Sequence, residues 1–134
     1  MDEKPVAIGP IAPLFIVEGL ARSVAFYVER LGFAVELSIP EESPFFAIVG
    51  RGATRVHLKE VGPEVSPLPN RTRHPFAAWD AFVLVDDPHA FADECRRAGL
   101  PVPSTLVVRD DGLLGVEVID ADGYVIFFGR PEGS

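Results

Sequence analysis

The chain repeats one pattern of secondary structure, and this repeat restricts its fold more than any other feature. In each half, a short apolar strand precedes a helical pattern that ends at a glycine, Gly32 in the first half and Gly99 in the second. When the two halves are aligned with Val17 on Val85, Gly32 and Gly99 differ by one position in the alignment. Three runs with strand-like alternation follow each helix. The sequence therefore predicts two copies of one βαβββ unit, related by a pseudo-twofold axis.

The boundaries of the predicted elements follow from hydrophobic period and turn residues. The first half holds strands at 12–17 and 33–39, a helix at 18–32 and a hairpin at 45–61. The second half holds a helix from 88 to 99 and strands at 79–85, 106–112, 113–120 and 124–129. We predict a single α+β domain over 1–134, with module one at about 10–62, a linker at 63–77 and module two at about 78–130. The two tandem modules are expected to form curved mixed sheets around a concave pocket.

Composition and charge exclude several classes of function. No apolar run approaches the roughly 20 residues that span a bilayer, and the first ten residues lack the pattern of a secretory signal. The single cysteine, Cys95, suits a reducing compartment, so we expect a cytoplasmic protein with this thiol in its core. A net charge of −8 with scattered basic residues excludes nucleic acid as a partner, and it favours a cationic ligand if it selects any.

The fourth strand of module one shows which side chains face away from the helix. Alternate residues of a strand point to opposite faces. Val56 and Leu58 are apolar and should meet the helix, which leaves Arg55, His57 and Lys59 on the open face of the sheet.

The last strand of module two follows the same register. Ile126 and Phe128 should point inward, and Val125 and Phe127 should lie on the open face. Phe127 is thus the repeat partner of His57.

These registers predict one shared surface. Ala12 in the first strand of module one corresponds to Asp80 in the first strand of module two. The two open faces should therefore bring Ala12, His57, Asp80 and Phe127 together. The same surface should include Phe45, Ala47, Phe82 and Glu117.

The order of several short motifs resembles the vicinal oxygen chelate superfamily, which includes glyoxalases, dioxygenases and bleomycin resistance proteins. The motifs are Phe26-Tyr27, Leu31-Gly32-Phe33, Val56-His57-Leu58 and 120–123, and the likeness covers about residues 10–130. The resemblance implies that metal-using members take histidines and carboxylates from four strand positions. Here those positions hold Ala12, His57, Asp80 and Phe127, and two of these four residues cannot bind a metal.

The bleomycin resistance branch is the closest fit, because its members lack the metal and bind a drug at a homodimer interface. By this resemblance we expect a homodimer without a cofactor that binds a small organic ligand, with antibiotics among the candidate ligands, and performs no chemistry on it. No catalytic residue is assigned. The expected ligand-binding residues are Phe45, His57, Trp79, Asp80, Phe82, Glu117 and Phe127.

Two alternatives stay open at this point. In the first, His57, Asp80 and Glu117 hold one divalent metal ion, and the protein is a lyase, isomerase or dioxygenase of the glyoxalase type. In the second, the open sheet faces form an interaction module with a closed pocket.

Overall fold

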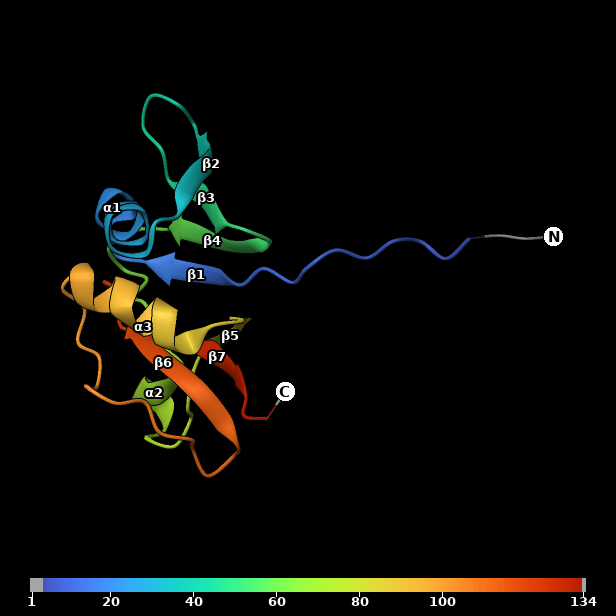
Figure 1. Cartoon of the computed structure of the whole chain (residues 1–134). Helices are drawn as coiled ribbons and strands as arrows, with labels where there is room; N and C mark the ends of the chain where they lie inside the picture. Colours follow the sequence, from blue (N-terminus) through green and yellow to red (C-terminus); the bar gives the residue numbers. More distant parts are fainter. Residues whose placement is uncertain (1–3, 134) are drawn as a thin grey trace.

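The computed structural model describes residues 4–133 and contains two sheets, each with its own helix (Figure 1). Its elements are β1 (Leu14–Val17), α1 (Leu20–Leu31), β2 (Ala34–Ile39), β3 (Phe46–Arg51), β4 (Thr54–Glu60), α2 (Asn70–Arg73), β5 (Ala81–Leu84), α3 (Pro88–Arg97), β6 (Leu113–Ile119) and β7 (Val125–Pro131). The first sheet has the strand order β1-β4-β3-β2 and the second has β5-β7-β6. In both sheets one strand pair is parallel and the others are antiparallel, which confirms the predicted α+β class.

The strand predicted at 106–112 is absent, and that prediction was wrong. Residues 106–109 have no regular structure, and the chain turns at 110–111 directly into β6. The turn is closed by two backbone bonds, from Arg109 N–H to Leu113 O at 2.8 Å and from Gly112 N–H to Arg109 O at 2.9 Å. The β-branched Val107 and Val108 before this turn are exposed and belong to no strand. Module two is therefore βαββ.

The helices begin and end where the sequence places their caps. Asp87 accepts a hydrogen bond of 3.0 Å from the backbone N–H of Ala90, and Pro88 occupies the first turn of α3. Gly32 closes α1 with φ 69°, and Gly99 follows α3 with φ 80°. Glycine carries no steric penalty in this left-handed region, so both helices end without strain.

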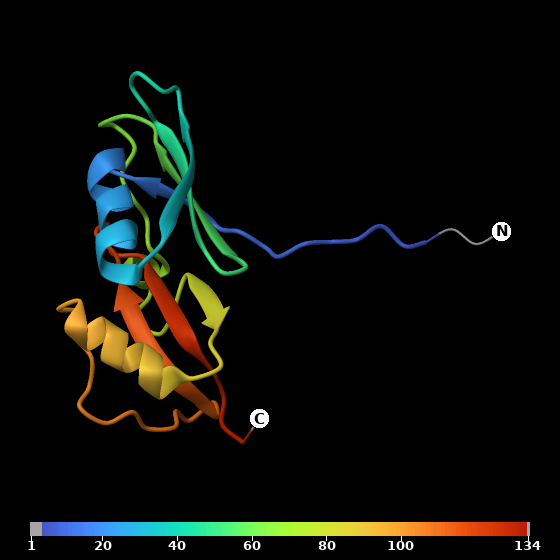
Figure 2. The ribbon, with the colours of Figure 1, turned by 45° about the horizontal axis from the view of Figure 1, so that its top comes forward.

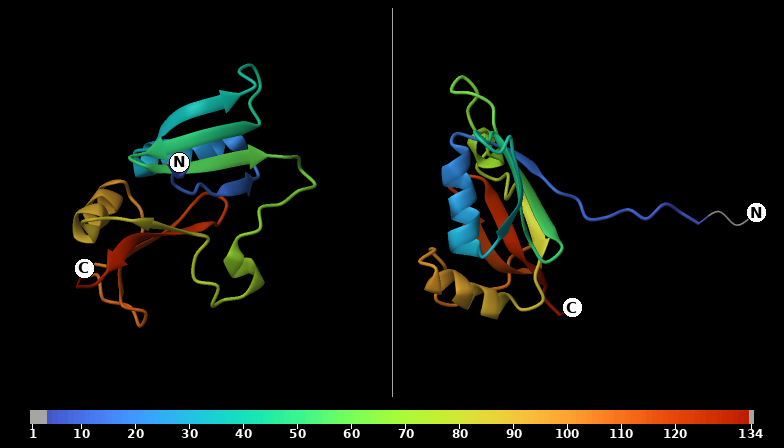
Figure 3. Two further views of the ribbon diagram at one scale, coloured as in Figure 1. Left: turned by 90° about the vertical axis from the view of Figure 1, so that its right-hand side faces the viewer. Right: turned by 90° about the horizontal axis from the view of Figure 1, so that it is seen from above.

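Helices α1 and α3 each cover one face of their own sheet (Figure 2). The side chains that meet the helices are those predicted from strand alternation: Val56 and Leu58 in β4, and Ile126 and Phe128 in β7, are all buried in the core. The two sheets lie side by side, joined by the linker that carries α2 (Figure 3). Before β1, residues 4–11 run away from both sheets (Figures 1 and 3). No helix within the described residues is long and apolar enough to cross a membrane.

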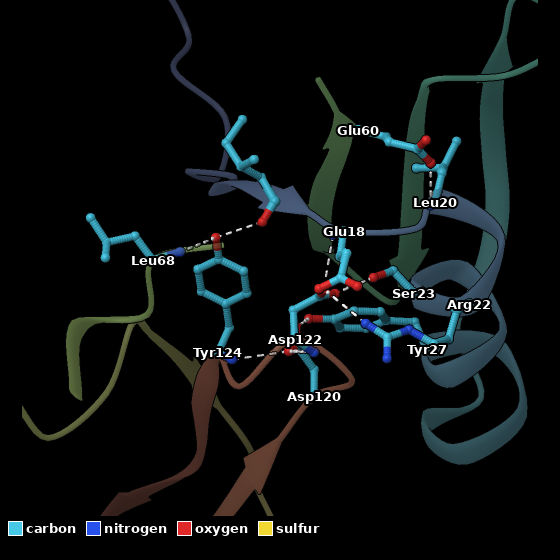
Figure 4. A network of polar contacts seen from close by, with 11 residues as sticks. Glu18, Leu20, Arg22, Ser23, Tyr27, Glu60, Leu68, Asp120, Asp122 and Tyr124 are labelled. Atoms are coloured by element: carbon cyan, nitrogen blue, oxygen red, sulfur yellow. Dashed lines mark hydrogen bonds and ion pairs between the residues drawn. The ribbon is translucent and has the colours of Figure 1, made fainter. Parts of the chain in front are cut away.

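A polar network fastens the last turn of module two to helix α1 of module one (Figure 4). The hydroxyl of Tyr27 donates to Asp120 at 2.6 Å, and the other carboxylate oxygen of Asp120 accepts from the backbone N–H groups of Asp122 and Tyr124, both at 2.9 Å. Asp122 in turn accepts from Ser23. Burial raises the pKa of Tyr27 well above its ordinary value, and burial also raises the pKa of Asp120 despite its hydrogen bonds. The turn thus connects the two modules as well as two strands.

Candidate functional site

Three aromatic side chains gather on the open face of the second sheet. The ring of Phe127 in β7 lies 5.1 Å from that of Trp79 and 5.7 Å from that of Phe82, measured between centroids. Phe82 pairs directly with Phe127 across the sheet, and Trp79 stands in the segment before β5. We call Trp79, Phe82 and Phe127 the aromatic cluster. Its geometry allows stacking and burial of a flat apolar group.

Phe127 occupies the predicted face, but it is not an open lining residue. Only 1% of it is exposed, because Trp79, Phe82 and Arg109 cover its ring. Val125, on the same face, is equally buried. The exposed part of the cluster is therefore Phe82, at 38%, together with the half-buried Trp79.

Two glycines in the neighbouring strand positions make room for the Phe127 ring. Gly115 and Gly129 face each other across β6 and β7. A Cβ atom at Gly115 would lie 2.9 Å from Cε1 of Phe127, and one at Gly129 would lie 2.5 Å from it. The ring therefore fills the space that two side chains would take. Glycine inside a strand is the sequence signal for such close approach, and the sequence interpretation did not use it.

Two arginines that the sequence analysis missed border the aromatic cluster. The guanidinium of Arg109 lies 5.1 Å from the Phe127 centroid and 5.4 Å from the Trp79 centroid, within cation–π range. One carboxylate oxygen of Glu117 accepts from Arg71 at 2.6 Å and from Arg109 at 3.2 Å. We call Arg71 and Arg109 the arginine pair. Arg71 comes from α2, and Arg109 from the segment that was predicted to be a strand, so no local pattern placed either one here.

Asp80 holds the backbone around the cluster and has both carboxylate oxygens occupied. Oδ1 accepts from Asn70 N–H and Oδ2 accepts from Val125 N–H, each at 2.8 Å. It thereby ties α2 and the start of β7 to the segment before β5. Ala78 lies two residues before Asp80 and directly before Trp79. Its φ is 57°, which is a strained value for alanine.

The first sheet presents His57 as predicted, but its neighbours differ. The ring of His57 is half-buried and lies 5.6 Å from that of Phe46, edge to face. Ala47 was placed on this face wrongly: it pairs with Leu58 and is buried toward α1. Phe45 precedes β3 and is 47% exposed, so Phe46 is the phenylalanine beside His57. An error of one residue in the start of the strand explains both results.

The superfamily resemblance implies a metal site, and the residues present do not fit one. Within residues 4–133, no three histidine, cysteine, aspartate or glutamate side chains lie close enough together to hold an ion. Both oxygens of Asp80 accept backbone N–H groups, and Glu117 is bound by the arginine pair. His57 lies on the other sheet. The predicted convergence of Ala12, His57, Asp80 and Phe127 therefore yields no ligand set in the described chain.

The largest cavity described lies away from the aromatic cluster. It has a volume of about 750 Å³ and opens between the turn after β3 and the segment around β5 and α3. Its apolar floor includes Phe33, Phe91 and Phe128. Of the charged residues at its rim, Arg51 and Glu94 form an ion pair of 3.0 Å. The cavity is large enough for a small molecule.

Comparison with known proteins gives one family and a consistent set of folds. Residues 7–128 match the model of the family described as the Glyoxalase/Bleomycin resistance protein/Dioxygenase superfamily. A search of curated protein sequences found no match. A bleomycin-binding protein from Streptomyces verticillus, solved with copper(II)-bleomycin, is 22% identical with a TM-score of 0.67, and the alignment covers 96% of this chain and 100% of that one.

Two further solved structures show the same fold at similar distance. An antibiotic-binding protein from a Streptomyces species is 20% identical with a TM-score of 0.67, covering 96% of this chain and 100% of that one. A glyoxalase-related enzyme from Clostridium phytofermentans is 14% identical with a TM-score of 0.69, covering 96% and 99%. The fold is thus shared by binding proteins and by an enzyme.

Proposed function

We propose that this chain, which belongs to the Glyoxalase/Bleomycin resistance protein/Dioxygenase superfamily, binds a small organic molecule without a metal and without reacting with it. The observation that carries the proposal is the aromatic cluster. A phenylalanine stands at the strand position where the resemblance expects a metal-binding acid, and Trp79 and Phe82 turn that region into an apolar stacking surface. The ligand-binding residues of this proposal are Trp79, Phe82, Glu117 and His57, and the buried Phe127 packs against the first two.

The chemistry of the donor groups supports binding without a metal. A carboxylate that already accepts two backbone N–H groups, as Asp80 does, would lose both bonds on turning toward an ion. If Glu117 turned toward an ion, the guanidinium groups of Arg71 and Arg109 would lose the carboxylate that they share. Metal binding at these residues would therefore oppose interactions that hold the site together.

The likeness to binding proteins gives independent support. Two of the similar solved structures are described as a bleomycin-binding and an antibiotic-binding protein. They share the fold with this chain over nearly its whole length, and an antibiotic is one ligand class that the proposal includes.

We further propose that the binding unit is a homodimer. Large apolar side chains are exposed on the open faces of both sheets: Leu14, Leu37, Ile39, Phe82, Leu84 and Ile119. Exposed large apolar side chains that share a sheet face are typical of an interface. If a second copy packs its sheets against these faces, the aromatic cluster of one copy lies opposite the His57 face of the other, and a groove between them receives the ligand.

The test uses Trp79, the single tryptophan of the chain, as its probe. We expect flat aromatic compounds, screened in the presence of EDTA, to change Trp79 fluorescence with saturable binding. Phe82→Ala should weaken that binding about ten-fold or more, because it removes the exposed stacking ring. Phe76→Ala is the matched control, since Phe76 is 87% exposed in the linker and does not belong to the aromatic cluster. Binding that needs an added divalent ion, or that Phe82→Ala leaves unchanged, contradicts the proposal.

A further inference from the structure

We infer that the ligand of the aromatic cluster is a planar acid, such as an aromatic carboxylate, which the arginine pair captures. This inference rests on the proposed function and names the ligand class. The net charge of −8 suggests the opposite, because an acidic protein attracts cations. The charges next to the aromatic rings, however, decide which ligand can enter.

The faces of the aromatic rings already have a cation next to them. The guanidinium of Arg109 already lies over Trp79 at 5.4 Å and over Phe127 at 5.1 Å. A cationic ligand that seeks these ring faces would have to displace Arg109 or meet its charge at close range. Either event costs free energy, since like charges repel strongly where water is partly excluded. The protein thus supplies its own cation for these rings.

The arginine pair has more N–H donors than its bonds to Glu117 and Asp111 use. A guanidinium has five N–H donors in a fixed fork. Arg71 spends one nitrogen, on Glu117 Oε2 at 2.6 Å. Arg109 bonds the same oxygen at 3.2 Å and also bonds Asp111, at the exposed end of the turn, at 3.3 Å. Side chains of Arg71 and Arg109 are each 34% exposed, so donors of both remain accessible for a further carboxylate.

The aromatic rings and the arginine pair together define the ligand. Its ring would stack on the exposed parts of Phe82 and Trp79, and its acid group would reach the arginine pair beside them. In the proposed homodimer the face opposite adds Lys59, which pairs with Phe46 across the first sheet on the same side as His57. A flat molecule with one acidic edge complements this arrangement, and neither a neutral nor a cationic molecule does.

The experiment compares three ligands that share one ring system: 2-naphthoate, 2-naphthamide and 2-naphthamidine. Dissociation constants are measured with the full chain by ligand-observed NMR titration at low ionic strength. The acid should bind about ten-fold more tightly than the amide or the amidine. Arg71→Gln and Arg109→Gln should each remove that preference, and Arg71→Gln is the safer variant because Arg71 makes only the bond to Glu117. Arg73→Gln is the matched control, since Arg73 lies on the same short helix and bonds only Asn70.

The outcomes separate this inference from the function on which it rests. If the amide or the amidine binds as tightly as the acid and Phe82→Ala weakens it, the inference fails and the binding function stands. The inference also fails if Arg71→Gln leaves the affinity for the acid unchanged. If none of the three ligands binds at millimolar concentration, the stacking site itself is contradicted.

Discussion

The hydroxyl of Tyr27 donates a 2.6 Å hydrogen bond to the carboxylate of Asp120 across 93 residues of sequence. Both groups are buried, and they connect helix α1 of the first module to the turn before β7 of the second (Figure 4). This bond matters for the site because β7 carries Phe127. This turn is therefore one of the contacts that hold the two modules together.

Replacing Tyr27 by phenylalanine should lower the free energy of unfolding by about 1–3 kcal/mol, since Asp120 keeps its burial and loses a donor. Urea denaturation followed by circular dichroism measures the change. Arg22→Gln is the control: Arg22 is a mostly exposed partner of the same turn, and its ion pair with Asp122 should contribute at most about 1 kcal/mol. Equal effects of the two substitutions would contradict the assigned role of Tyr27.

Replacing Gly129 by alanine should displace the Phe127 ring. The new Cβ would stand 2.4 Å from Leu114 O and 2.5 Å from Phe127 Cε1, which is closer than such atoms approach. Overpacking of this kind costs about 1–3 kcal/mol, and urea denaturation measures it. The fluorescence of Trp79 should shift as well, because Trp79 contacts Phe127. Gly9→Ala, with open space around its Cβ, should change neither quantity.

The thiol of Cys95 should be unreactive in the folded protein. Burial raises its pKa from 9.0 to about 11, so at pH 8 only about one thiol in a thousand is ionised. Labelling with Ellman's reagent should be slow in buffer and fast in urea. As pH rises above 9, the unfolded thiol releases its proton before the folded one does, so stability should fall between pH 9 and about 11. Rapid labelling of the folded chain would show that the packing around α3 is wrong.

Replacing Leu84 by glutamate tests the proposed homodimer. Leu84 is 72% exposed on the open face of β5, so the folded monomer should tolerate the charge. Sedimentation velocity should show a dimer for the parent chain and a weakened dimer, by about ten-fold or more, for the variant. Leu68→Glu, at an exposed position of the linker, should leave the dimer intact. A monomeric parent chain would contradict the homodimer.

The parts of the fold that depend on local pattern were predictable from the sequence. Asp87 and Gly99 bound α3 because caps act within one turn of the helix, and Val56 and Phe128 face inward because strand alternation is a local property. The one-residue error at Phe45 and the strand wrongly placed at 106–112 both lie at element boundaries. There, local preference competes with turns that satisfy the backbone in another way.

The surroundings of the site depend on contacts between distant segments, and the sequence indicated them only in part. Alternation placed Phe127 on the correct face, but the residues that cover it come from the segments at Trp79 and Arg109. Asp80 was predicted to face the ligand, and the structure instead uses both its oxygens on the backbone of residues 70 and 125. Hydrophobic periodicity in the sequence does not predict such contacts, because they involve loop residues and not only the faces of helices or strands.

Chemical-shift mapping tests the central claim most directly. A ¹H–¹⁵N spectrum of the full chain is recorded in EDTA during titration with 2-naphthoate. Ligand binding at the aromatic cluster predicts that the indole N–H of Trp79 and the backbone amides of Phe82, Glu117 and Phe127 shift most. Shifts that gather instead around Phe33, Phe91 and Phe128, in the cavity between β3 and α3, would contradict it, as would shifts that appear only after a divalent metal is added.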